Sequence, residues 1–166
     1  MNFIFFIFQD WKANSNNTKG KLVLFFFRIA NGCSKRKYLK YIGIPYLVFY
    51  KFFIEWVLGI EIPWNLKAGK NLVLYHGQAL VINCDTVIGE NCVLRHCTTL
   101  GNSSSGSGSP VIEDHVDIGA NVIIIGRIVI GRNSTIGAGT VITKSIPANS
   151  VVVGNPARVI KTKEEI

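Results

Sequence analysis

The chain has 166 residues, of which 48% are hydrophobic and only 17% are charged. This balance excludes a disordered protein, since disorder needs few apolar and many charged residues, and the length is that of one domain. The net charge of +8 lies entirely in residues 1–70, with eleven Lys or Arg against three Asp or Glu, which indicates an anionic surface or ligand as partner.

The N-terminal segment Met1–Phe8 is apolar, but Asp10 and Lys12 follow it closely. A secretory signal needs a basic start and a small-residue cleavage site, and this segment has neither. The apolar stretches 22–27 and 44–58 are too short or too interrupted by charges to cross a bilayer, which takes about 20 apolar residues. We therefore expect a cytoplasmic protein.

Residues 1–60 are expected to form a short N-terminal helical region. Within 46–58, large apolar residues recur at the i, i+3, i+4 spacing of a helix, and Pro45 suits its first turn. This helix either packs within the protein or an oligomer, which is the commoner use, or docks peripherally on an anionic membrane. The basic residues Lys35-Arg36-Lys37 and Lys40 would assist the membrane contact. The apolar positions of the helix are Tyr46, Phe49, Tyr50, Phe53, Trp56 and Val57.

A six-residue repeat governs the second part of the chain, 61–156. A helix repeats at 3.6 residues and a strand at 2, so neither explains this period. The pattern predicts a β-solenoid, in which aliphatic side chains point inward and stack on their equivalents one coil away. A small or β-branched residue stands two positions before most of these aliphatics and fits the narrow interior. The aliphatic positions are Ile82, Ile88, Leu94, Leu100, Ile112, Ile118, Ile124, Ile130, Ile136 and Ile142.

Two irregularities interrupt the repeat. An earlier aliphatic set, from Ile62 to Leu80, is offset by two positions, so the register slips between Leu74 and Ile82. The run 102–110 is rich in Ser and Gly and has no apolar residue to stack, which predicts a mobile loop leaving the solenoid. A glycine-rich linker without function is the alternative. Residues 157–166 are expected to form a C-terminal tail.

The four cysteines form no CxxC pair and show no metal-ligand spacing. This favours buried or partly buried free thiols over a disulfide framework, and no metal is expected. The glycine-rich motifs that hold nucleotide phosphates are also missing. The cysteines are Cys33, Cys84, Cys92 and Cys97.

Three histidines offer chemistry near neutral pH. His76 lies in the register slip, and His96 follows one coil later, since three six-residue turns make about 18 residues per coil. We expect the two to lie near each other. Glu61, which precedes His76 by fifteen positions, could orient its imidazole. His115 is expected to be a solvated turn residue. A lone histidine is more often structural than catalytic, so sequence alone leaves both roles open.

Three segments, Tyr75–Asn83, Arg95–Asn102 and Val152–Ile160, together with the hexapeptide pattern, resemble the bacterial hexapeptide-repeat acyltransferases. Within this family the chain looks like the serine acetyltransferase-like group, and most like the short colanic-acid-type exopolysaccharide acetyltransferases. The resemblance covers roughly residues 8–160. It implies a mainly β fold, a left-handed parallel β-helix, which is an exception to the right-handed crossover rule. It also implies a homotrimer with sites between neighbouring subunits, acetyl-CoA as donor, and no metal.

The same resemblance implies residue roles. His76 matches the general base that takes a proton from an acceptor hydroxyl, which then attacks the thioester directly. Glu61 falls where serine acetyltransferases carry the aspartate that partners this base. The loop 102–110 matches the family's extended loop over the donor site. Positions near the coenzyme A groove, with small residues for the pantetheine and bases for its phosphates, are Ala120, Ala138, Gly139, Lys144 and Arg158.

The acceptor is expected to differ from serine. Serine acetyltransferases hold their zwitterionic substrate with an Asp before the catalytic His and an Arg-His pair in the loop, whereas this chain has Tyr75 and Gly108-Ser109 there. Tyr75 suits a sugar face, and His96 could bind an acceptor hydroxyl. We therefore expect a carbohydrate acceptor, from a surface polysaccharide or its precursor, and no nucleic-acid partner.

Two alternative functions stay open. One is a serine O-acetyltransferase of cysteine biosynthesis, and the other is a non-catalytic solenoid scaffold. A metal-dependent solenoid enzyme such as a γ-class carbonic anhydrase is disfavoured, because the three histidines lack that family's ligand spacing.

Overall fold

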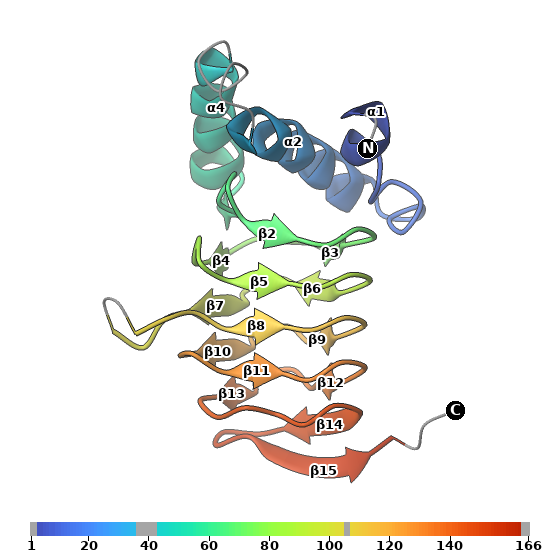
Figure 1. Cartoon of the computed structure of the whole chain (residues 1–166), viewed down its shortest axis with the longest axis vertical. Helices are drawn as coiled ribbons and strands as arrows, with labels where there is room; N and C mark the ends of the chain where they lie inside the picture. The colour runs from blue at the N-terminus through green and yellow to red at the C-terminus, as the bar shows by residue number, and fades with distance from the viewer. Residues whose placement is uncertain (1–2, 36–42, 105–106, 164–166) are drawn as a thin grey trace.

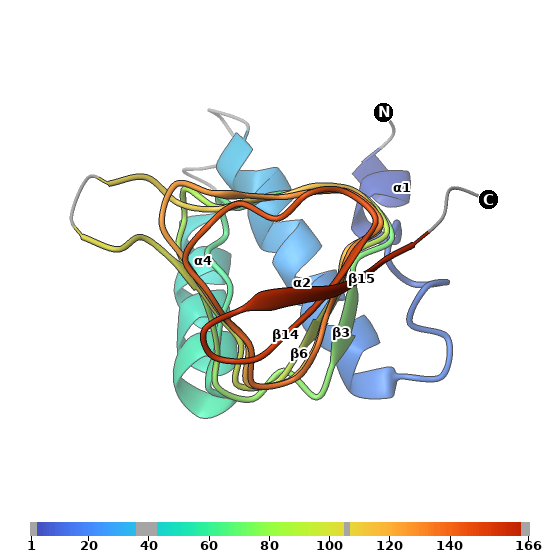
Figure 2. The same cartoon turned by 90° about the horizontal axis from the view of Figure 1, so that it is seen from below.

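The computed structural model describes residues 3–35, 43–104 and 107–163. The chain forms a solenoid of short parallel strands, and helices cover its N-terminal end (Figure 1). Seen from the C-terminal end in Figure 2, the chain runs clockwise as it comes toward the viewer, so the coils wind left-handed. The fold is mainly β, a left-handed parallel β-helix, as the sequence predicts.

The strands stack into three sheets, which we call A, B and C after their order along each coil, and every pairing is parallel except that of β14 with the last strand, β15. Sheet A contains β1 (Ile60–Glu61), β4 (Leu80–Ile82), β7 (Thr99–Gly101), β10 (Ile123–Ile125) and β13 (Val141–Ile142). Sheet B contains β2 (Lys67–Ala68), β5 (Val87–Ile88), β8 (Val111–Ile112) and β11 (Val129–Ile130). Sheet C contains β3 (Val73–Tyr75), β6 (Val93–Arg95), β9 (Asp117–Ile118), β12 (Thr135–Ile136), β14 (Ser150–Val153) and β15 (Arg158–Thr162).

The interior of the solenoid confirms the six-residue repeat. All ten predicted aliphatic positions from Ile82 to Ile142 are at most 3% exposed. The predicted small residues, among them Thr86, Thr98 and Ser134, are buried between them. Each row of side chains stacks directly on the next because the strands pair in parallel register. No coil could bury its apolar row alone, so the stacking itself stabilises the solenoid.

The two irregularities of the repeat have structural counterparts. In the first coil, Leu74 pairs with Leu94 and Ile60 with Leu80, so this coil is twenty residues long. The regular coils further on are shorter, since Ile112 pairs with Ile130. The extra residues form the turn 76–79, which confirms the register slip. The run 102–110 joins β7 to β8 and projects from the solenoid (Figures 1 and 2).

Two of the three corners carry a column of residues with left-handed backbone, which lets the chain turn sharply between sheets. The corner between sheets B and C has a column of such residues, whose side chains also contact one another: Asn71, Asn91, His115, Asn133 and Asn149. The corner between sheets C and A, which we call the C–A corner, has a second column: His76, Ala79, Cys97, Asn121 and Gly139.

The N-terminal region is helical, with α1 (Phe3–Ile7), α2 (Thr18–Lys35), α4 (Ile44–Tyr50) and a following π-helix η1 (Lys51–Val57). The helix expected after Pro45 is confirmed, with Pro45 in its first turn. Its second half is a π-helix, which the i, i+3, i+4 pattern did not predict. Arg36, Lys37 and Lys40 lie outside the described residues.

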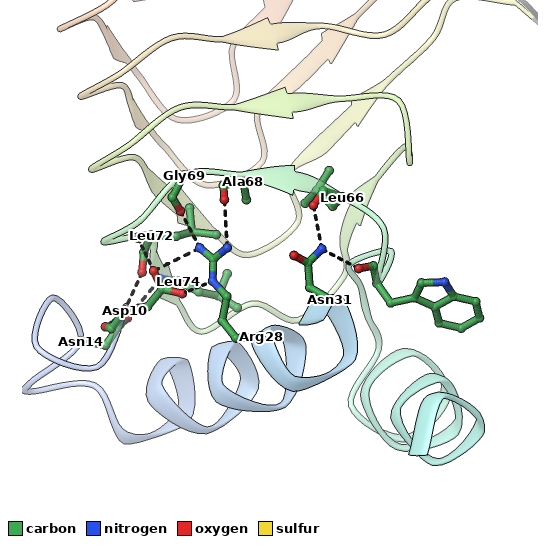
Figure 3. A network of polar contacts seen from close by, with 10 residues as sticks. Asp10, Asn14, Arg28, Asn31, Leu66, Ala68, Gly69, Leu72 and Leu74 are labelled. Atoms are coloured by element: carbon green, nitrogen blue, oxygen red, sulfur yellow. Dashed lines mark hydrogen bonds and ion pairs between the residues drawn. The ribbon is translucent and has the colours of Figure 1, made fainter. Parts of the chain in front are cut away.

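Polar side chains join the helices to the first coil (Figure 3). Arg28 of α2 is fully buried, donates to Asp10 at 2.7 Å, and also donates to the carbonyls of Ala68 and Gly69. Asp10 accepts in turn from the backbone N–H of Leu72 at 2.9 Å. The uppermost coil has no strand above it, so its backbone groups would otherwise lack partners. The helical region therefore caps the open end of the solenoid.

Candidate active site

His76 stands at the end of strand β3, where the first coil turns from sheet C to sheet A. The Gly77 N–H donates to the Tyr75 carbonyl at 2.8 Å, which closes a γ-turn centred on His76 with a φ of +66°. Such backbone is uncommon for a residue with a side chain and is often retained at functional sites. The His76 side chain is exposed on the outside of this corner.

The imidazole of His96 lies directly below that of His76. The ring centroids are 5.6 Å apart and the ring planes cross at 80°, an edge-to-face arrangement. This confirms that the coil brings the two histidines together. The Nδ1 atom of His96 is buried and has no hydrogen-bond partner among the described residues. A buried nitrogen without a partner can accept a hydrogen bond from a bound molecule.

Tyr75 and Arg95 occupy paired positions on the outer face of sheet C. The Arg95 guanidinium lies 5.6 Å from the centre of the Tyr75 ring, a cation–π contact. Arg95 also forms an ion pair with Asp117 and donates to the Ile118 carbonyl at 2.9 Å. Arg95 therefore fixes Tyr75, which is 42% exposed, beside the two histidines. No role was expected for Arg95, although its place before His96 and twenty residues after Tyr75 could have indicated one.

Glu61 lies on β1, next to the turn that carries His76. Ala79 donates to the Gly59 carbonyl at 2.7 Å, and a Cβ on Gly77 would lie 3.0 Å from the Ile60 side chain. Within the described residues, however, no hydrogen bond joins Glu61 to His76. The exposed Glu61 side chain instead lines a cavity of about 560 Å³. The other residues of this cavity are Ser34, Lys51, Glu55, Pro63, Trp64, Asn65, Ile82 and Cys84.

The environment of this cavity shifts the titration of Glu55. Burial raises the pKa of Glu55, the nearby Lys51 ammonium lowers it, and the charge of Glu61 raises it again. Lys51 lies 4.0 Å from Glu55. The cavity thus combines carboxylates, an amide and an indole ring at the junction of the helices and the first coil.

Three of the five expected coenzyme A positions lie on the C–A corner below the histidines. Asn121 donates to the His96 carbonyl at 3.1 Å, and Gly139 donates to the Ala120 carbonyl at 2.9 Å, which links successive coils. Ala120, Ala138 and Gly139 therefore continue the column of His76 and His96. The coils approach so closely here that a Cβ on Gly119 would lie 2.6 Å from the Ala138 nitrogen. At Ala120, Ala138 and Gly139 the corner therefore presents backbone atoms and small side chains instead of bulky side chains.

The two expected phosphate-binding bases lie further from the histidines. Arg158 is exposed at the start of β15 and pairs with Val153 near the lower end of the same corner. Lys144 is exposed after β13, at the opposite end of that sheet A strand. The structure therefore places Arg158 beside the column and Lys144 away from it.

The loop 102–110 leaves the solenoid between sheets A and B, at the far end of sheet A from the two histidines (Figure 2). Ser109 donates to the Asn83 side chain at 3.0 Å, and Gly108 packs on the Arg127 side chain. Residues 102–104 and 107–110 of the loop therefore lie away from the histidines of their own chain.

The cysteines are free thiols, as the sequence predicts, but not all are buried. Cys33 is half-buried and Cys92 buried, whereas Cys84 and Cys97 are exposed. Cys97 follows His96 directly. No group of three or more His, Cys, Asp or Glu that could hold a metal occurs within 3–35, 43–104 and 107–163. His115 is exposed at a turn, where its ring contacts the Asn91 amide at 3.4 Å.

Comparison with known proteins gives a consistent set of relatives. The family described as "Bacterial transferase hexapeptide (six repeats)" matches residues 109–144. The colanic acid biosynthesis acetyltransferase WcaB of Escherichia coli (strain K12) is 37% identical over 156 residues, which cover 91% of this chain and 96% of WcaB. Serine acetyltransferase 2 of Arabidopsis thaliana is 38% identical over 114 residues, 68% of this chain but only 35% of that protein.

A solved serine acetyltransferase has the same architecture. The enzyme of Brucella abortus strain S19 in complex with coenzyme A superposes with a TM-score of 0.79 at 28% identity. The match covers 96% of this chain and 68% of that chain.

Proposed function

Because the chain belongs to the bacterial hexapeptide-repeat transferases and is an acyltransferase, we propose that it transfers the acetyl group of acetyl-CoA to a sugar hydroxyl. The acceptor would be a surface polysaccharide or its precursor. The observation that carries this choice is the extent of the WcaB match, which takes in 96% of that acetyltransferase. The match to the plant serine acetyltransferase covers 35% of its length.

In this proposal His76 is the general base. Its exposed imidazole takes the proton of the acceptor hydroxyl while the hydroxyl oxygen attacks the thioester carbonyl carbon. The carbon–sulfur bond breaks, the acetyl group stays on the sugar oxygen, and the coenzyme A sulfur recovers the proton from the imidazolium. No acyl-enzyme forms. Support comes from the γ-turn, which presents His76 outward at the end of β3.

Glu61 is proposed to orient the His76 imidazole and stabilise its protonated form once the substrates are bound. Its support is position: β1 pairs with β4, the strand that follows the His76 turn. Glutamate has one more methylene than the aspartate of serine acetyltransferases. Its side chain therefore needs a different conformation to bring the carboxylate to the imidazole.

The donor is proposed to lie along the C–A corner. Small residues at Ala120, Ala138 and Gly139 leave room for the narrow pantetheine arm below His76 and His96. Arg158 lies beside the lower end of this column, where its guanidinium could meet a phosphate. Lys144 lies at the far end of its strand, so it is proposed as a contact to the phosphates of the donor bound by a neighbouring subunit. The Brucella abortus relative binds coenzyme A.

Tyr75 and His96 are proposed to bind the acceptor. An aromatic ring packs well against the apolar face of a sugar, and Arg95 already holds Tyr75 in place. The unpartnered Nδ1 of His96 can accept a hydrogen bond from a sugar hydroxyl. Neither group is a charge partner for a zwitterion such as serine.

We further propose a homotrimer in which each site lies between neighbouring subunits. The loop 102–110 projects away from its own histidines and so could cover those of a neighbour (Figure 2). Since acetyl-CoA is a cytoplasmic metabolite, the proposed reaction takes place in the cytoplasm, in contact with the inner face of the membrane where the acceptor is lipid-linked. Among the described residues, no helix is long and apolar enough to cross a bilayer.

Serine O-acetylation is the second candidate, and one observation favours it. Solved structures that match this chain include serine acetyltransferases, and two of these have serine bound. A panel assay decides between the two: release of free coenzyme A thiol is followed with acetyl-CoA and either serine, hexoses, N-acetylhexosamines or oligosaccharides. Turnover with saccharides alone supports the proposal, and turnover with serine alone contradicts it.

A further inference from the structure

A ridge of exposed apolar side chains runs along α4 and η1. It consists of Ile44, Val48, Phe52 and Trp56, which follow one another at four-residue intervals. Their exposed fractions are 49%, 64%, 56% and 75%. Leu47 and Trp64 lie beside the ridge, and the whole forms an apolar groove of about 510 Å³ with Lys51 as its one charged residue.

The fold itself does not need this ridge. The opposite side of the same helices holds the packing residues, since Tyr50 and Ile54 are at most 1% exposed. The Tyr50 hydroxyl donates to the Ile62 carbonyl at 2.8 Å, which fixes the helices to the first coil. A contiguous exposed apolar surface of this kind marks an interaction site.

We propose that the ridge of α4 and η1 docks on an anionic lipid bilayer. An amphipathic helix with Trp and Phe on one face and basic residues nearby lies in the plane of a membrane interface. Among the described residues no helix could span the bilayer, so the contact is a surface contact. The proposal deepens the proposed function by naming the partner that would present a lipid-linked acceptor.

Charge favours an anionic bilayer as the partner of the ridge. All of the +8 net charge lies in residues 1–70, and Lys35, Arg36, Lys37 and Lys40 fall within the ten residues before the ridge begins. Lys51 stands at the edge of the groove and is 53% exposed. Anionic headgroups attract basic residues near a membrane surface by about 1 kcal/mol each.

The position of the ridge places the candidate site close to the docked surface. The helices cap the N-terminal end of the solenoid, and His76 and His96 belong to the first coils below that cap (Figure 1). Successive coils are about 4.8 Å apart. The cavity of Glu55 and Glu61 borders the groove, because Lys51 and Trp64 line both. A saccharide that is held at the bilayer by its lipid therefore meets the polar side chains of this cavity before it reaches His76 and His96.

The test measures retention of the full chain by vesicles of phosphatidylcholine with or without phosphatidylglycerol. We expect retention only with phosphatidylglycerol, and loss of retention in high salt. The double variant F52S/W56S removes two exposed rings and should weaken binding at least about tenfold. Ile160→Ser is the matched control, since Ile160 is 63% exposed at the other end of the molecule.

Three results would overturn the proposal. The first is retention of F52S/W56S equal to that of the wild type, and the second is no retention of the wild type. The third is a smaller oligomer for F52S/W56S in light scattering, which would make the ridge a subunit interface. Acetyl transfer to water-soluble saccharides without vesicles should be equal in all three proteins. That assay separates failure of docking from failure of the proposed function.

Discussion

The imidazole rings of His76 and His96 stack edge to face with their centroids 5.6 Å apart. This alignment depends on the length of the first coil. With Leu74 opposite Leu94, the coil has twenty residues, so position 76 falls above position 96. A coil of the regular length, as between Ile112 and Ile130, would place His76 above Leu94 instead. The register slip thus creates the histidine pair.

Replacement of His76 tests the general base. His76→Asn keeps a polar side chain that tolerates left-handed backbone but cannot take up the proton. We expect kcat to fall by a factor of about 10² to 10⁴ with saccharide acceptors. His115→Asn is the control, because His115 lies at the opposite corner in a column of asparagines. Equal losses in the two variants would exclude a special role for His76.

Replacement of His96 tests acceptor binding. His96→Phe keeps a ring of similar shape but removes the buried Nδ1 that has no partner among the described residues. Loss of one hydrogen bond to the acceptor should raise its KM about tenfold and leave the KM of acetyl-CoA unchanged. Initial rates over both substrate concentrations provide the measurement. A change confined to the KM of acetyl-CoA would assign His96 to the donor instead.

The ion pair of Arg28 and Asp10 should dominate the attachment of the helical cap. Arg28→Ala leaves Asp10 buried without its partner, and the free energy of unfolding should fall by about 3–5 kcal/mol. Urea denaturation followed by circular dichroism measures this change. Lys70→Ala is the matched control, because Lys70 and Glu90 form an exposed pair 3.3 Å apart that should contribute less than about 1 kcal/mol. Similar losses in both variants would contradict a special role for the buried pair.

Thiol alkylation should separate the cysteines by burial and pKa. Burial raises the pKa of Cys92 to about 11, so only about one thiol in a thousand is a thiolate at pH 8. Cys84 and Cys97 are exposed and should be alkylated by iodoacetamide first. Raising the pH toward 11 in the folded protein should increase the reactivity of Cys92. Peptide mass spectrometry identifies the modified residues, and early labelling of Cys92 would contradict the buried environment.

Much of the fold could be predicted from the sequence because the solenoid repeats one local pattern, an inward-pointing aliphatic residue at every sixth position. The isoleucines at every sixth position indicate which side chains point inward. Parallel stacking of the coils then determines which residues are neighbours of each one. The proximity of the two histidines followed from the same arithmetic, because their separation of twenty residues is close to one coil of about 18 residues. These features depend on spacing alone, so a sequence shows them directly.

Other features depend on contacts that no local pattern encodes. In the sequence, Arg28 looks like one more exposed base. In the structure it pairs with Asp10 and donates to backbone carbonyls of the first coil, where it is buried. Arg95 was overlooked because its role comes from Tyr75 and Asp117 on neighbouring coils. The π-helix after Tyr50 differs from an α-helix in its backbone hydrogen bonds and not in its residue composition, so the sequence does not reveal it. The side-chain direction of Glu61, toward Glu55 and Lys51, likewise depends on how the helical cap sits on β1.

The most direct test of the account is a competition in one reaction. Acetyl-CoA, serine and a mixture of neutral oligosaccharides are incubated with the enzyme, and the acetylated products are identified by mass spectrometry. We expect O-acetylated saccharide with little O-acetylserine, and loss of the saccharide product in His76→Asn. O-acetylserine as the main product, or a saccharide product that persists in His76→Asn, would contradict it.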